Sequence, residues 1–142
     1  MDINFKGWRV LAVDDEPDNL KLISDLLEFK GAEVCRAEDG QQGLGLVDGF
    51  KPTLILLDLA MPGVDGWEMH RQLRQRPALN AVPIIALTAL AMPQDAQRVM
   101  DAGFDGYITK PFRFNDLLEK LFRIADEFGR RHGADEKGGA NG

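Results

Sequence analysis

The sequence predicts an α/β fold in which a doubly wound parallel sheet of five strands carries helices on both faces. Five short apolar runs alternate along the chain with segments of helical periodicity. This alternation is typical of right-handed βαβ units, which build parallel sheets. The run at 54–57, with the sequence LILL, is apolar at four successive positions, as expected of a central strand buried on both faces.

Each element follows from local signals. The expected strands are residues 9–13, 34–37, 54–58, 83–87 and 106–109. The first helix is expected to begin at Pro17, because proline is favoured at the first helical position, and to end before Gly31. The other helices are expected at 41–48, 67–76, 94–102 and 115–128.

The C-terminal segment has a different composition from the rest of the chain. Residues 129–142 hold five glycines and no large apolar side chain. Such a segment cannot bury enough apolar surface to offset the entropy of ordering. We therefore predict one folded domain over 1–128 and a disordered tail over 129–142.

Composition excludes several classes of function. With 142 residues and 44% hydrophobic side chains, the chain has the composition of one globular domain. A net charge of −6 and the lack of any lysine- or arginine-rich block argue against direct binding to nucleic acid. No stretch is long and apolar enough to span a membrane, and the first residues lack the apolar core of a signal peptide. Because Cys35 is the only cysteine, no internal disulfide can form, and we expect a cytoplasmic protein.

Polar side chains collect where the predicted strands end. Asp14 and Asp15 follow the first strand, and Asp58 ends the third. Thr88 and Lys110 follow the fourth and fifth strands. In an open α/β sheet, ligands bind in the crevice at the carboxyl ends of the strands. We therefore expect these side chains to converge from four loops into one site.

The residue types at this site suit phosphoryl transfer. Clustered carboxylates without histidine or cysteine neighbours favour a hard divalent cation such as Mg²⁺. A carboxylate can act as a nucleophile and form an aspartyl phosphate, and we predict this role for Asp58. Lys110 and the Thr88 hydroxyl would then pair with phosphoryl oxygens. A single aspartate at a strand end is more often a turn or cap residue, so the prediction depends on the convergence of all four loops.

Four motifs resemble a known family: VLAVDDE at 10–16, LLDLAMPGVDG at 56–66, IIALTA at 84–89 and YITKPF at 107–112. In this order and at this spacing they resemble the receiver domain of two-component response regulators, and the likeness runs from Trp8 to Phe128. The resemblance implies a flavodoxin-like fold with strand order 2-1-3-4-5. It also implies a single-domain member similar to the chemotaxis regulators.

The resemblance assigns the acceptor and the metal ligands. It implies that Asp58 is the phospho-acceptor, and that Asp14, Asp15, Asp58 and the main-chain carbonyl of Ala60 hold Mg²⁺. In this family, the side chains at the positions of Ala60 and Leu90 flank the path of a hydrolytic water. Neither of these two side chains can form a hydrogen bond here, so we predict slow loss of the phosphoryl group.

The resemblance also assigns a switch. Thr88 and Tyr107 correspond to the family's switch pair, in which the hydroxyl moves toward the phosphoryl group and the ring turns inward. Lys110 corresponds to the family's phosphoryl-binding lysine, and its bond to Pro111 corresponds to a cis peptide bond. Phosphorylation would add charge and acceptor oxygens at one end of the sheet and bias the surface formed by the fourth helix, fifth strand and fifth helix.

A response regulator implies two kinds of protein partner. The phosphoryl group would come from a histidine kinase or a phosphotransfer protein, and the switched surface would control a downstream protein that the sequence does not name. Phosphorylation-linked formation of a homodimer is left open. Such a protein is a switch and not an enzyme, since a haloacid-dehalogenase-type phosphatase needs a second acid at the position of Ala60. The acidic residues after the first strand would also repel the flavin phosphate of a flavodoxin.

Two other interpretations belong to the same fold. The chain could be a receiver module taken from a hybrid histidine kinase or a longer regulator, although the initial Met1 favours a protein that stands alone. It could also be a binding module that works without phosphorylation. Elsewhere in the chain, His70 is expected to be a solvated surface residue, and the expected core residues of the last helix are Leu117, Leu121, Ile124 and Phe128.

Overall fold

The computed structural model describes residues 3–89 and 92–141, with side chains described up to His132. Strands and helices alternate along the chain. The elements are β1 (Arg9–Val13), α1 (Pro17–Phe29), β2 (Glu33–Ala37), α2 (Gly40–Phe50), β3 (Leu54–Asp58), α3 (Gly66–Leu73), a 3₁₀ turn (Pro77–Leu79), β4 (Ile84–Thr88), α4 (Pro93–Asp101), β5 (Gly106–Thr109) and α5 (Phe114–Asn141).

The strands form one parallel sheet in the order β2-β1-β3-β4-β5. This confirms the predicted doubly wound sheet and the strand order 2-1-3-4-5. Val13 of β1 pairs with Leu57 of β3, so Asp14 and Asp58 follow at neighbouring positions on adjacent strands. The order of the strands therefore brings the first and third loops together at the carboxyl end of the sheet.

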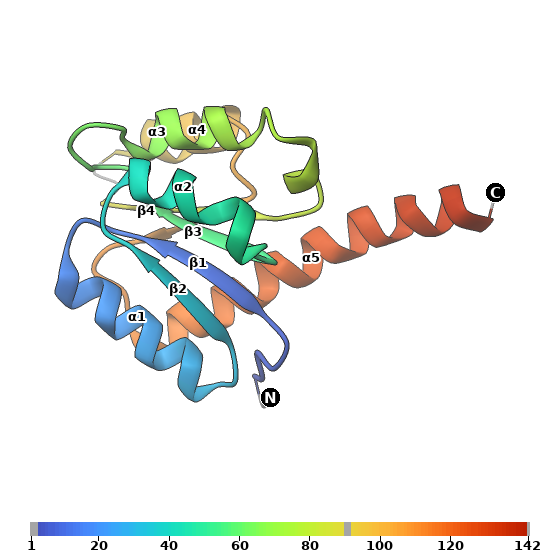
Figure 1. The fold of residues 1–142 in the computed structure, drawn as a ribbon, viewed down its shortest axis with the longest axis horizontal. Coiled ribbons are helices and arrows are strands. Elements are labelled where there is room, and N and C mark those ends of the chain that lie inside the picture. Colours follow the sequence, from blue (N-terminus) through green and yellow to red (C-terminus); the bar gives the residue numbers. More distant parts are fainter. Residues whose placement is uncertain (1–2, 90–91, 142) are drawn as a thin grey trace.

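Helices cover both faces of the sheet (Figure 1). One core layer lies under α2, α3 and α4, where Met69 and Val99 are buried against the sheet. The other layer lies under α1 and α5, where Leu27 and Leu121 are buried. All residues of β3 are buried, as predicted for a central strand, because both layers pack against it.

Element boundaries differ from the predicted ones by a few residues. α1 begins at Pro17 as predicted. α3 ends at Leu73 rather than at residue 76, because Pro77 begins a separate 3₁₀ turn. The last strand, Gly106–Thr109, has the predicted bounds.

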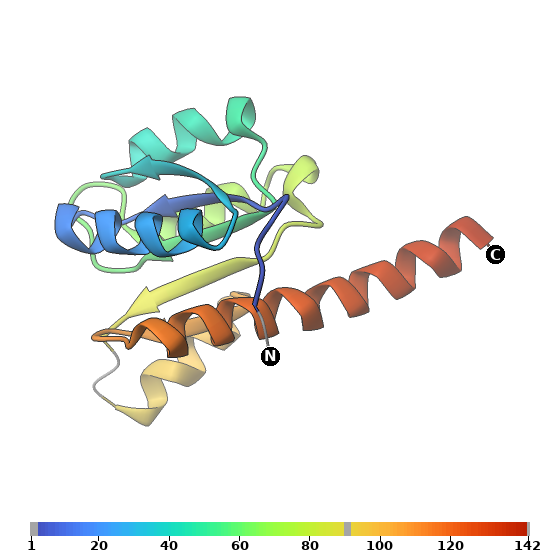
Figure 2. The same cartoon turned by 90° about the horizontal axis from the view of Figure 1, so that it is seen from below.

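The last helix continues beyond its predicted end. The sequence predicts an end at Phe128, the last buried side chain among those described in this helix, whereas α5 runs to Asn141. Two contacts between residues one turn apart support the first turn beyond Phe128: the His132 ring stacks on Phe128 at 3.8 Å, and Arg130 pairs with Asp126 at 3.0 Å. α5 extends past the sheet in both views (Figures 1 and 2). The division into a domain at 1–128 and a disordered tail at 129–142 stays a prediction.

The segment before β1 is pinned to α5. The rings of Trp8 and Phe122 stack with centroids 6.1 Å apart, and Phe5 meets both rings edge-on. Figure 2 shows this segment beside the middle of α5. Among the described residues, no helix combines the length and the apolar character that crossing a membrane would require.

Candidate functional site

The candidate site is built from the loops that follow β1, β3, β4 and β5. Asp14 comes directly after β1, while Asp58 and Thr88 are the last residues of β3 and β4. Asp58 pairs with Leu87 in the sheet register, and the backbone N–H of Lys110 donates to the carbonyl of Thr88 at 2.9 Å. Four segments that are distant in the sequence therefore meet at the carboxyl end of the sheet, as predicted.

Lys110 lies at the centre of the charged groups. Its ammonium nitrogen is 3.1 Å from Asp14 Oδ2, 3.2 Å from Asp58 Oδ2 and 3.4 Å from Glu16 Oε1. The Asp14 and Asp58 side chains are 0% and 4% exposed, the Lys110 side chain is 14% exposed, and the Glu16 side chain is 63% exposed. One ammonium therefore serves two buried carboxylates and one exposed carboxylate. The contact of Glu16 is not among the predicted roles.

Backbone groups orient the two buried carboxylates. The N–H of Glu16 donates to Asp14 Oδ1 at 2.9 Å, and the N–H of Ala60 donates to Asp58 Oδ1 at 3.1 Å. Each carboxylate thus has one oxygen held by a backbone donor two residues along the chain. The other oxygen of each carboxylate faces Lys110. This arrangement leaves Asp14 Oδ2 buried with no hydrogen bond of good geometry.

A glycine allows α3 to begin directly beside the end of β3. A Cβ atom at Gly66 would lie 2.3 Å from the carbonyl oxygen of Asp58 and 2.7 Å from the Cα atom of Leu59. Any side chain there would push the backbone of α3 away from β3. Asp65 caps the same helix, since its carboxylate accepts from the N–H of Glu68 at 2.9 Å.

Burial and charge shift the ionisation of the buried pair. Burial, reinforced by the nearby Asp14 carboxylate, raises the pKa of Asp58 to about 6, although the hydrogen bond from Ala60 and the charge of Lys110 oppose the rise. Burial disfavours the charged form of Lys110, but its ion pairs with Asp14 and Asp58 outweigh this effect and raise its pKa. The site holds more negative than positive charge, and an added cation would relieve that imbalance.

The acidic residues after β1 offer oxygen ligands to such a cation. Asp14, Asp15 and Glu16 can each supply one carboxylate oxygen, and these atoms lie within 4.8 Å of one another. Asp14 Oδ2 is paired with Lys110 but accepts no hydrogen bond of good geometry, and this free acceptor capacity and an all-oxygen donor set fit a hard ion such as Mg²⁺. Within the described part of the chain, this group includes Glu16 and leaves out Asp58, whose Oδ2 atom is turned toward Lys110.

The two predicted switch residues are half-buried and lie on neighbouring strands. Thr88 lines a cavity of about 330 Å³ between the loop after β3 and helix α4, together with Ala60, Trp67 and Arg98. The guanidinium of Arg98 lies 5.1 Å from the centroid of the Trp67 ring. Tyr107 of β5 packs against the core layer under α2, α3 and α4, and the Lys120 ammonium of α5 lies 5.9 Å from its ring centroid.

Two further expectations concern the loops around the site. The Lys110–Pro111 peptide bond is cis, as the resemblance implies. Ala60 is exposed. Leu90, the other position tied to the lifetime of the phosphoryl group, lies outside the described residues.

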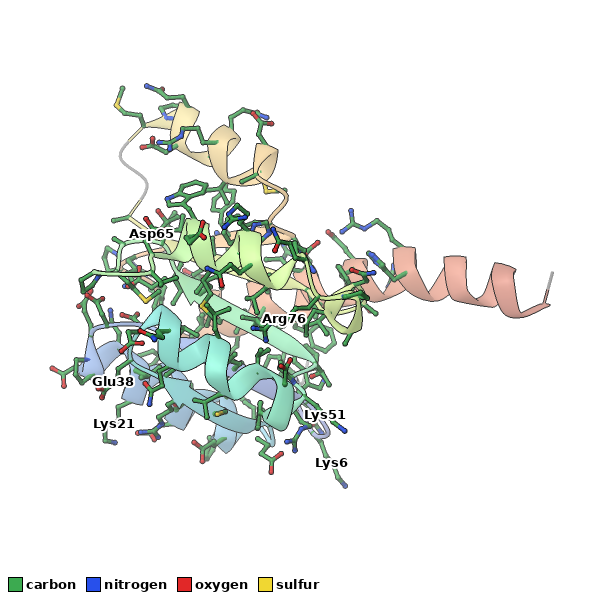
Figure 3. All side chains as sticks on the ribbon, turned by 45° about the horizontal axis from the view of Figure 1, so that its top comes forward. Lys6, Lys21, Glu38, Lys51, Asp65 and Arg76 are labelled. Atoms are coloured by element: carbon green, nitrogen blue, oxygen red, sulfur yellow. The ribbon has the colours of Figure 1, made fainter. Side chains whose placement is uncertain are left out.

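Figure 3 places the charged loops relative to the two ends of the sheet. Glu38 and Asp65 lie toward the end where the strands finish. Lys6, Lys51 and Arg76 lie toward the opposite end. The candidate site is thus at the end whose loops supply these acids.

His70 is not the solvated surface residue that the sequence suggests. It is 5% exposed, and its ring stacks on Phe104 with centroids 4.0 Å apart. Its Nε2 atom is buried with no hydrogen-bond partner. The prediction was wrong because α3 turns this position toward the loop between α4 and β5, a contact that the periodicity of one helix does not reveal.

Comparison with protein families gives one match over most of the chain. A family described as "Response regulator receiver domain" matches residues 10–122. The curated relatives include the "DNA-binding dual master transcriptional regulator RpaA" of Synechocystis, which is 39% identical over 113 residues. That alignment covers 80% of this chain and 47% of RpaA, so the chain spans about half the length of that relative.

Shorter relatives match over nearly their whole length. The "Polar-differentiation response regulator DivK" of Brucella anthropi is 37% identical over 112 residues, which cover 79% of this chain and 91% of DivK. Among solved structures, the chemotaxis response regulator CheY4 of Vibrio cholerae superposes with a TM-score of 0.78 at 32% identity. That alignment covers 82% of this chain and 98% of CheY4.

Proposed function

Since the chain belongs to the response regulator receiver domain family, whose members are signalling switches rather than enzymes, we propose that it accepts a phosphoryl group on Asp58. The observation that carries this proposal is the position of the Lys110 ammonium between the buried carboxylates of Asp14 and Asp58. A buried aspartate beside one lysine, with backbone donors fixing its orientation, is suited to nucleophilic attack on phosphorus.

The transfer replaces one bond to phosphorus with another. A carboxylate oxygen of Asp58 forms a bond to phosphorus while the bond from phosphorus to the donor's histidine nitrogen breaks. The electron pair of the broken bond stays on that nitrogen, and the imidazole leaves as a neutral base because its other ring nitrogen carries a proton. Lys110 then pairs with a phosphoryl oxygen. Asp14, Asp15, Asp58 and the Ala60 carbonyl are the residues we propose to hold Mg²⁺. When bound, this ion neutralises charge on the transferred group.

A groove beside Lys110 supports the approach of a protein donor. It has a volume of about 500 Å³ and lies between α1 and the loop after β5, where its walls include Asn19, Leu22, Ala89 and Phe112. It opens next to the ammonium that contacts Asp58. We propose that the phosphorylated histidine of a kinase or a phosphotransfer protein enters here.

The output surface is formed by α4, β5 and α5 in this proposal. Val99 is the only buried residue of α4, so few packing contacts oppose a shift of this helix. Met92 directly before α4, Met100 in α4 and Phe114 at the start of α5 are exposed, and their apolar surface is suited to a protein partner. Recruitment of Thr88 to the phosphoryl group would link the site to this surface, with Tyr107 turning inward.

The test is the intact mass of the protein after incubation with a small acyl-phosphate donor, with and without Mg²⁺. We expect a single phosphoryl adduct that requires Mg²⁺, disappears in Asp58→Asn and remains in Asp18→Asn. Asp18 is a matched control, because it is an exposed aspartate in the first turn of α1. An adduct on Asp58→Asn would refute the assignment of the acceptor. Absence of any adduct on the wild type would favour a phosphorylation-independent binding module.

A further inference from the structure

Glu16 is the one exposed member of the three acids around Lys110. Its carboxylate lies 3.4 Å from the ammonium nitrogen, compared with 3.1 and 3.2 Å for the buried Asp14 and Asp58. Its side chain is 63% exposed, so it meets the ammonium from the solvent side of the site. The ammonium is therefore drawn in two directions, inward by two buried acids and outward by Glu16.

The backbone fixes Glu16 in a position from which its side chain can reach Lys110. Glu16 stands at the N-cap of α1 in an extended conformation, and its carbonyl accepts from the N–H of Leu20 at 3.0 Å. Its own N–H donates to Asp14 Oδ1. N-cap side chains usually bond to the first turn of their helix, but this one makes no such bond. The carboxylate is directed at Lys110 instead.

We propose that Glu16 is a positioning residue that holds the Lys110 ammonium at the mouth of the site. This inference rests on the proposed function of Asp58. Without Glu16, the ammonium would settle more deeply between Asp14 and Asp58. With Glu16, it stands on the side from which a phosphoryl group reaches Asp58. Glu16 also remains a counter-ion for Lys110 when Asp14 binds a metal ion.

Two other roles for Glu16 make different predictions. As a third metal ligand beside Asp14 and Asp15, it would contribute to Mg²⁺ affinity whether or not Lys110 is present. As a negative charge at the mouth, it would repel an anionic donor, and its removal would speed phosphorylation. A positioning role predicts slower phosphorylation and an effect that depends on Lys110.

The primary experiment observes the lysine directly. Proton and nitrogen NMR of the side-chain ammonium groups reports how fast the Lys110 signal exchanges with solvent, and Lys110→Met identifies that signal. We expect slow exchange in the wild type and in Asp18→Asn, which removes an equal charge two residues away, and faster exchange in Glu16→Gln. An absent Lys110 signal in the wild type, or equal exchange in Glu16→Gln and Asp18→Asn, would overturn the proposal.

The second experiment measures the rate of phosphorylation and the affinity for Mg²⁺, the latter by calorimetry. Relative to Asp18→Asn, we expect Glu16→Gln to slow phosphorylation about two- to fivefold, the size expected for a partly exposed ion pair. Mg²⁺ affinity should change no more than in Asp18→Asn. Faster phosphorylation, or weaker Mg²⁺ binding that persists in Glu16→Gln/Lys110→Met, would assign Glu16 one of the other roles. If no adduct forms on the wild type, the proposed function fails while NMR still tests the contact with Glu16.

Discussion

The ammonium nitrogen of Lys110 lies 3.2 Å from Asp58 Oδ2, although 52 residues separate the two in the sequence. The same ammonium pairs with Asp14, so two buried carboxylates share one partly buried cation. Burial and the charge of Asp14 raise the pKa of Asp58 to about 6. Asp58, the proposed acceptor, is therefore held ionised at neutral pH at a cost to the stability of the fold.

This cost predicts that Asp58→Asn stabilises the protein near neutral pH in Mg²⁺-free buffer. The folded pKa of about 6 exceeds the reference value of 3.8, so the folded state binds the proton more tightly than the unfolded state. The stabilisation from protonated Asp58 is fully present at pH values below the pKa of this residue in the unfolded state. It is lost as the pH rises through the folded-state pKa of about 6. We expect the free energy of unfolding to increase by about 1–3 kcal/mol near neutral pH.

Urea denaturation at several pH values measures this effect. Near pH 3.8, the reference pKa of aspartate, the side chain at position 58 of the folded protein is largely neutral in both the wild type and the variant. The difference in their free energies of unfolding should therefore vanish. Asp18→Asn should show no comparable gain. A variant less stable than the wild type near neutral pH would contradict the reasoning.

For His70 we predict that the stability of the fold depends on pH with a sign opposite to that for Asp58. Burial lowers its pKa below 6.5, and the nearby Arg74 adds to the shift, although the backbone of Gly103 and the charge of Asp105 oppose it. The unfolded state therefore binds the proton more readily, so stability is lost as the pH falls below 6.5. His70→Phe keeps a ring that can stack on Phe104 and should reduce this loss.

The measurement compares thermal unfolding above and below pH 6.5 for the wild type, His70→Phe and His132→Gln. His132 is the matched control, because it lies on the extended part of α5 and stacks on a single ring. Only His70→Phe should lose acid sensitivity in this pH range. For one proton, the free energy of unfolding changes by at most about 1.4 kcal/mol per pH unit. Equal acid sensitivity in all three proteins would show that His70 does not titrate as described.

Two glycines in helices should respond to alanine in opposite ways. A Cβ atom at Gly66 would meet backbone atoms of Asp58 and Leu59, whereas one at Gly45 in α2 would meet nothing within 4 Å. We expect Gly66→Ala to lower the free energy of unfolding by about 1–3 kcal/mol and to slow phosphorylation by displacing β3. Gly45→Ala should raise the free energy of unfolding by about 0.5–1 kcal/mol, because alanine costs less backbone entropy in a helix. If chemical denaturation gave the same change in the free energy of unfolding for Gly66→Ala and Gly45→Ala, the close approach of α3 to Asp58 would be refuted.

The lifetime of the phosphoryl group should depend on the side chain of Ala60. This residue is exposed, and its N–H bonds to Asp58 Oδ1, so a longer polar side chain would reach the face of the acceptor. We expect Ala60→Asn to speed decay of the adduct about two- to tenfold, which corresponds to one hydrogen bond of about 0.5–1.5 kcal/mol to the attacking water. The adduct is followed by mass after removal of the donor, with Ala81→Asn as an exposed control. An unchanged decay rate in Ala60→Asn would show that this position does not limit hydrolysis.

Much of the architecture follows from local patterns. The strand Leu54–Asp58 has the predicted bounds, because its four successive apolar residues, LILL at 54–57, suit a strand buried on both faces. Parallel strands then bring their carboxyl ends to one edge of the sheet. For this reason Asp14, Asp58, Thr88 and Lys110 could be assigned to one site before any distance was known.

The remaining features were decided by tertiary packing. Glu16 and Lys110 are 94 residues apart, and their contact depends on the direction of a side chain at the start of α1. The burial of His70 depends on which face α3 turns toward Phe104. Residue periodicity records which positions can be buried, but not which groups fill the space opposite them. Local sequence patterns were therefore enough to predict the sheet and the convergence of its polar strand ends, whereas the packing of α1 and α3 set the contacts of Glu16 and His70.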